Sequence, residues 1–238
     1  MISPNPLRNS KSQADSAIAA PLHTVALLVL LAGYAIWGKI RADQLRAANN
    51  PEHLKLYLMI GLSEWILFGF TLWGSSARVL LGPRWKSLRQ VLLDIGIAAG
   101  FWISSAIVLA ILGRILGVTP FAREAEFLLP RGPAELAAWV AISVSAGICE
   151  EAIFRGYLQR QFISWTRRAP IGILLSAALF GAGHIYQGYR SAVLIAAYGS
   201  MFGILAYWRK TVRPGMMAHA WQDSLSGLVA GVIQRSLR

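Results

Sequence analysis

The sequence predicts an all-α protein, a polytopic transmembrane helix bundle of about seven to eight spans. Of its 238 residues, 55% are hydrophobic and only 14% are charged. A typical soluble domain has roughly 25% charged residues. Apolar runs recur along the chain, each close to the roughly 20 residues that cross the hydrocarbon core of a bilayer. The nine tryptophans fit the same prediction, because Trp is enriched at membrane interfaces.

Seven apolar runs are predicted to span the membrane. In chain order they are residues 22–38, 56–74, 91–118, about 136–162, 171 to about 186, 191–208 and 215–233. Turn signals such as Gly82-Pro83 and Ala169-Pro170 separate them. Residues 121–129 are predicted to form an eighth, interfacial helix.

The chain is predicted to form one integral-membrane domain over residues 1–238, because no repeat or low-complexity tract interrupts it. Residues 1–20 are a polar N-terminal tail. We interpret the first run as a retained span instead of a signal peptide, because it is long and Lys39 and Arg41 follow it without a convincing cleavage site. The motif-bearing spans are expected over residues 136–233.

The formal net charge of +12 raises the question of nucleic-acid binding. The Lys and Arg residues lie between the apolar runs and form no single basic stripe, so we expect membrane lipid, and not nucleic acid, as their partner. The loops after the second, fourth and sixth runs are rich in Lys and Arg. By the positive-inside rule this favours a cytoplasmic N-terminus. We expect an integral protein of the cell membrane.

The run at residues 145–156 is unusual because it holds Glu150, Glu151 and Arg155 among apolar residues. Ionisable side chains inside a membrane are expensive and usually functional. Glu151 and Arg155 are four residues apart, so on a helix they are expected to form an ion pair. On a regular helix Glu150 points about 100° away from Glu151. The spacing therefore predicts that Glu150 faces a cavity and is free to act on water.

Two later runs carry further polar side chains. His184 follows Phe180 by four residues, with glycines between them, and His219 and Asp223 are also four residues apart. Two histidines and a free carboxylate can bind a metal, or can activate a water without one. Counted at about 1.5 Å per residue, these groups lie at different depths. A common site therefore requires tilted or broken helices.

Together the polar residues resemble the motif series of the CPBP family of intramembrane proteases. The series reads Glu150-Glu151-x-x-x-Arg155, then Phe180-x-x-x-His184, then His219-x-x-x-Asp223. This family includes the type II CAAX prenyl endopeptidases and many bacterial relatives, some linked to bacteriocin immunity. The resemblance covers roughly residues 140–231, and the first three predicted spans carry no signature of it.

The resemblance implies a protein of the bacterial inner membrane and a role for each motif. Glu150 and His184 would polarise a water that attacks the scissile carbonyl. His219 and Asp223 would lie opposite, at the oxyanion or at a metal. The supporting residues would be Glu151, Arg155 and Phe180.

The resemblance does not decide whether the protein uses a metal, because the family has been described both as metalloproteases and as glutamate-dependent proteases. A divalent metal such as zinc would be held by Glu150, His184 and His219. An ionised Asp223 cannot donate a hydrogen bond to an oxyanion, whereas the Asn that the family also allows there can. Asp instead of Asn at position 223 therefore slightly favours a metal-dependent mechanism.

The predicted function is endopeptidase cleavage of a peptide or protein near the membrane surface. One alternative is a non-catalytic immunity or partner-binding protein on the same scaffold. Another is a cation- or proton-coupled transporter with a relay that includes Glu64, although a polar interhelical contact explains Glu64 more simply. Cys149 adjoins the motif, but a thiol buried among apolar groups is inert, so we interpret it as core.

Overall fold

The protein is described by a computed structural model that covers residues 17–47, 52–118 and 127–236. Within these residues every regular element is helical, which confirms the all-α prediction. The first half contains α2 (Pro21–Ala47), α3 (His53–Gly74), α4 (Ala77–Leu81) and α5 (Leu88–Leu116). The second half contains α6 (Pro133–Glu150), the π-helix η2 (Glu151–Leu158), α7 (Gln159–Thr166), α8 (Ala169–Gly183), the short 3-10 helix η3 (Ile185–Gln187), α9 (Tyr189–Arg209) and α10 (Arg213–Ser236).

Each of the seven predicted spans corresponds to helix in the structure. Within the described residues, five stretches are long and apolar enough to cross a membrane: Pro21–Ala47, His53–Gly74, Leu88–Leu116, Pro133–Thr166 and Tyr189–Arg209. The other two predicted spans are α8, which has only 15 residues, and α10, which carries several polar side chains. The predicted interfacial helix at residues 121–129 falls mostly outside the described residues.

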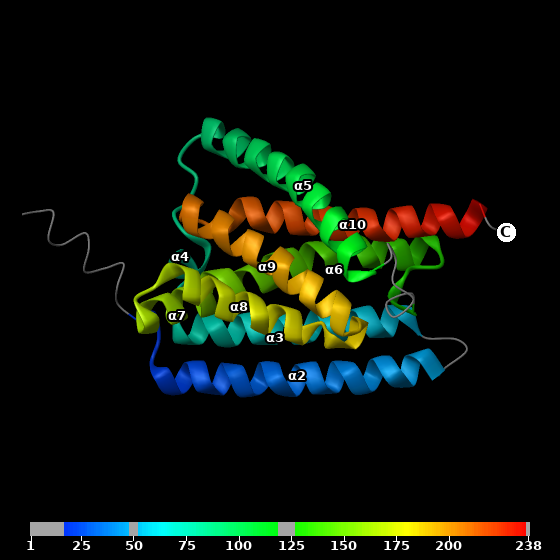
Figure 1. Cartoon of the computed structure of the whole chain (residues 1–238), viewed down its shortest axis with the longest axis horizontal. Coiled ribbons are helices and arrows are strands. Elements are labelled where there is room, and N and C mark those ends of the chain that lie inside the picture. The colour runs from blue at the N-terminus through cyan, green and yellow to red at the C-terminus, as the bar shows by residue number, and fades with distance from the viewer. Residues whose placement is uncertain (1–16, 48–51, 119–126, 237–238) are drawn as a thin grey trace, which may run out of the picture.

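The long helices form a bundle with α6 in its interior (Figure 1). α6 packs against α3 on one side and α10 on the other, and α8 pairs with α9. α5 packs on α10 and α9 along one edge of the bundle, while α2 lies beside α3. Large aliphatic side chains such as Ile36, Leu58 and Ile107 are exposed on the outer helices. Such a surface suits contact with lipid.

Three loops rich in Lys and Arg meet at one end of the bundle. Arg160 donates a hydrogen bond to the carbonyl of Val79, and Arg213 donates to the carbonyl of Pro83. Arg209 pairs with Asp94 at 2.8 Å. The loops that the charge pattern assigned to one side of the membrane are therefore neighbours in space.

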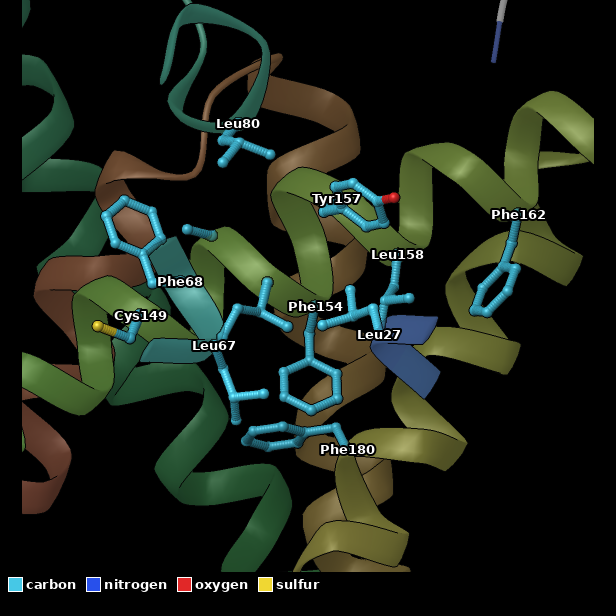
Figure 2. Packing of buried hydrophobic residues seen from close by; sticks show 12 residues of the cluster. Leu27, Leu67, Phe68, Leu80, Cys149, Phe154, Tyr157, Leu158, Phe162 and Phe180 are labelled. Carbon is cyan, nitrogen blue, oxygen red and sulfur yellow. The ribbon is translucent and has the colours of Figure 1, made fainter. Parts of the chain in front are cut away.

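The apolar core is centred on η2, all eight residues of which are buried. Figure 2 shows Phe154 of η2 close to Phe180 of α8, and their ring centroids are 5.0 Å apart. Leu27 of α2 and Leu67 of α3 complete this part of the cluster. Cys149 is fully buried, as expected for a core residue. The segment with the charged motif is thus also part of the apolar core.

Candidate active site

The motif at residues 150–155 does not lie on a regular α-helix. α6 ends at Glu150, and the π-helix η2 begins at Glu151. A π-helix has i→i+5 hydrogen bonds and often marks a functional site. Its turn is wider than that of an α-helix, but Glu150 and Glu151 themselves keep right-handed helical dihedral angles. Their two carboxylates reach opposite nitrogens of the same histidine.

The predicted ion pair of Glu151 and Arg155 is present. Arg155 Nη1 lies 2.8 Å from Glu151 Oε1, and both side chains are only 1% exposed. Arg155 Nη2 donates to the carbonyl of Gly199 at 3.2 Å. The guanidinium also lies 4.3 Å from the ring centroid of Phe180 and 5.1 Å from that of Phe202. Arg155 is therefore fully occupied inside the protein.

His219 of α10 is the residue on which the acidic side chains converge. Its Nδ1 lies 3.1 Å from Glu151 Oε1. Its Nε2 lies 3.6 Å from Glu150 Oε2 and 3.5 Å from Asp223 Oδ2. An ionised carboxylate only accepts hydrogen bonds, so the hydrogen at Nδ1 points to Glu151. The Glu151–Arg155 pair thereby orients the imidazole, and Nε2 faces the other two carboxylates.

The close approach of α6 and α10 depends on Gly147. A Cβ atom at this position would lie 2.7 Å from the carbonyl oxygen of Met216 and 3.0 Å from the backbone nitrogen of Ala220. Only a hydrogen fits there. The two helices are therefore in backbone contact one turn before Glu150, and this contact brings His219 within reach of the motif.

His184 is at the C-terminal end of α8, where it caps the helix. Its Nδ1 lies 2.8 Å from the carbonyl oxygen of Phe180. A carbonyl accepts only, so Nδ1 carries the hydrogen, and in the neutral ring Nε2 keeps its lone pair. Among the described residues, no hydrogen bond or ion pair joins His184 to Glu150. The two histidines are linked through Phe180, whose ring centroid is 4.8 Å from that of His184 and 6.1 Å from that of His219.

Two glycines, Gly181 and Gly183, lie between Phe180 and His184. Gly181 permits close approach of a neighbouring helix, because a Cβ there would lie 2.5 Å from the carbonyl oxygen of Ala192 on α9. Gly183 has open space around its Cβ position. The tight contact of α8 with α9 therefore depends on Gly181 and not on Gly183. It also depends on Gly199 and Gly203 of α9, where a Cβ would crowd side chains of α8.

Glu64 of α3 is a further acidic residue beside the site. It is 5% exposed and accepts a hydrogen bond from Ser145 at 3.1 Å. It also interacts electrostatically with Glu150, His219 and Asp223. In the sequence, Glu64 stands out as an ionisable residue within an apolar run. No spacing or neighbouring motif connects it with the motifs of the last four spans.

The three expected metal ligands, Glu150, His184 and His219, do not form a coordination site among the described residues. Within the parts of the chain that the structure describes, no group of three or more His, Cys, Asp or Glu side chains has the geometry to hold a metal ion. The hydrogen bond from His184 Nδ1 to a carbonyl leaves its Nε2 free, as in many metal-binding histidines, but among the described residues no hydrogen bond or ion pair joins His184 to Glu150 or His219. Zinc binding by these three residues stays a prediction, and we derive no step through a metal.

Comparison with known families agrees with the motifs. Residues 132–225 match the family model described as type II CAAX prenyl endopeptidase Rce1-like. The match supports the resemblance of this segment to the CPBP family of intramembrane proteases. It begins at the N-cap of α6 and contains all seven candidate residues, whereas Glu64 and helices α2–α5 lie outside it. No curated protein and no solved structure matches the chain.

Proposed function

We propose that this protein is an intramembrane endopeptidase in which Glu150 and His184 activate the attacking water. The observation that carries the proposal is the convergence of Glu150, Glu151 and Asp223 on His219 within the family segment. A carboxylate beside an oriented imidazole is a common arrangement for general acid–base catalysis.

Exposure gives the two adjacent glutamates different roles. The side chain of Glu150 is 19% exposed, whereas that of Glu151 is 1% exposed and paired with Arg155. Glu150 is therefore the carboxylate that water can reach. Glu151 and Arg155 act indirectly, because they hold His219 in place.

In the proposed reaction, Glu150 takes a proton from a water whose oxygen attacks the scissile carbonyl carbon. The unprotonated Nε2 of His184 is available to hold this water from a second direction. When the carbon–nitrogen bond breaks, the proton passes from Glu150 to the leaving nitrogen. The products are a carboxylic acid and an amine, and no group of the protein is consumed.

The test is peptide cleavage by the purified full-length protein in detergent micelles. We would use two internally quenched probes, a peptide with a farnesylated C-terminal CAAX box and an unprenylated peptide library. Glu150→Gln should lower the cleavage rate by roughly 10²- to 10⁴-fold, the usual contribution of a general base. Glu52→Gln, the same change at an exposed position, should leave the rate unaltered.

Equal rates for the wild type and Glu150→Gln would refute the mechanism. Two results together would favour the non-catalytic alternative. The wild-type protein would cleave neither probe, and cells that carry Glu150→Gln would keep the phenotype of the intact gene.

A further inference from the structure

His184 and Glu150 act on one water in the proposed reaction, but they come from different elements. His184 caps α8, and Glu150 ends α6 where the π-helix η2 begins. Because no hydrogen bond or ion pair joins them among the described residues, their relative position depends on how α8 is held against η2. The rings of Phe154 on η2 and Phe180 on α8 are in contact at 5.0 Å (Figure 2). Aromatic pairs tolerate several geometries, so this contact alone does not fix the register of the two helices.

Ser176 of α8 donates a hydrogen bond across to the backbone of η2. Its Oγ lies 2.7 Å from the carbonyl oxygen of Phe154, and the residue is only 1% exposed. A serine within a helix often donates to a carbonyl of its own preceding turn, as Ser164 of α7 does with the carbonyl of Gln161. A hydroxyl has one hydrogen to donate, and Ser176 has committed it to the neighbouring element.

The acceptor of this bond is a carbonyl that marks the π-turn. In an α-helix the carbonyl of Phe154 would accept from the N–H of Leu158, four residues later. In η2 it accepts from the N–H of Gln159, five residues later. A carbonyl oxygen has two lone pairs, and the Ser176 hydroxyl takes the second. Ser176 therefore holds η2 at a carbonyl whose backbone bond distinguishes a π-turn from an α-turn.

Ser176 also lies on the face of α8 that carries the motif. Phe180 and His184 follow it by four and eight residues, and each step of four turns the direction by only about 40° on a regular helix. The distance along the axis from Ser176 to His184 is about 12 Å. A shift or rotation of α8 at Ser176 would therefore move the imidazole relative to Glu150.

We propose that Ser176 is a positioning residue, whose hydrogen bond to the Phe154 carbonyl fixes α8 against the π-helix so that His184 and Glu150 reach the same water. This inference rests on the proposed endopeptidase function. Ser176 touches neither the water nor the substrate, and it acts through the placement of His184.

The test is Ser176→Ala, which removes the hydroxyl and leaves the Phe154 carbonyl bonded to Gln159. With whichever of the two quenched probes the wild type cleaves faster, kcat should fall about 10- to 100-fold, because a misplacement of about 1 Å can cost that much. KM should stay within about threefold, since Ser176 does not contact the substrate. Ser176→Thr keeps a hydroxyl at the same position and should bring kcat back to within about threefold of the wild type.

Ser164→Ala is the matched control. It removes another buried hydroxyl whose hydrogen bond is also 2.7 Å long but stays within its own helix. Both alanine variants should lower the thermal midpoint by at most about 6 °C, but Ser164→Ala should keep the wild-type kcat. In a His184→Ala background, Ser176→Ala should lower the remaining rate by less than about twofold, because no imidazole is left to place.

A kcat for Ser176→Ala within about threefold of the wild type would overturn the assignment of Ser176 as a positioning residue. An equal loss of kcat in Ser164→Ala would overturn it too, because the loss would then reflect general stability. The same holds for a Ser176→Thr protein of normal thermal midpoint whose kcat is as low as that of Ser176→Ala.

A full further loss of rate in the His184→Ala background would show that Ser176 acts on a group other than His184, and would also overturn the assignment. Each of these results leaves the endopeptidase function standing if Glu150→Gln is inactive on the same probe. A wild-type protein that cleaves neither probe would remove both proposals.

Discussion

Arg155→Met removes the guanidinium that neutralises Glu151 while keeping a long apolar side chain in the same space. The two side chains are each 1% exposed, so Glu151 would be left as a buried carboxylate without its cation. Breaking a buried pair in this way costs about 3–5 kcal/mol. For a chain of this size, that loss corresponds to a fall of about 6–20 °C in the thermal midpoint. Contacts with Gly199 and with the rings of Phe180 and Phe202 would be lost as well.

The assay is thermal unfolding of the detergent-solubilised protein, followed by intrinsic Trp fluorescence. The double variant Glu151→Gln with Arg155→Met should recover more than half of the lost midpoint, because it removes both charges together. Arg168→Met, a matched change at an exposed arginine, should shift the midpoint by less than about 2 °C.

Two results would refute the reasoning. One is an Arg155→Met midpoint within about 2 °C of the wild type. The other is a double variant as unstable as the single one, which would show that the cost does not come from the stranded charge on Glu151.

Two further predictions concern the neighbourhood of the motif. Gly147→Val should separate α6 from α10, lower the free energy of unfolding by about 1–3 kcal/mol and abolish cleavage. Gly100→Val, at a glycine with open space around it, should have none of these effects. A fully active Gly147→Val would contradict the packing argument. Cys149→Ser should retain cleavage within about threefold, because the thiol is buried core and takes no part in the proposed chemistry. Inactivation of Cys149→Ser in a protein of normal thermal midpoint would show a role for the sulfur.

Spacing along one helix was enough to predict several features of the site. The Glu151–Arg155 and His219–Asp223 contacts both join residues four positions apart, and both are present. Such pairs depend only on local helix geometry. The spacing also separates Glu150 from Glu151, and in the structure the two side chains differ in exposure, 19% against 1%.

One acidic residue that spacing along the chain did not connect with the motifs comes from another helix. Glu64 lies in α3, outside the segment that matches the family, and has no motif of its own. Its hydrogen bond with Ser145 of α6 follows from helix packing.

The sequence by itself determined the membrane class, the helical spans and the order of the three motifs, because composition, run length and i, i+4 spacing are local properties of the chain. Only the tertiary structure decided which motifs meet. Glu151 and His219 are 68 residues apart, and they touch because Gly147 lets α10 come into backbone contact with α6. A contact of that kind depends on the shapes of two helix surfaces together, and the pattern of either helix alone does not contain it.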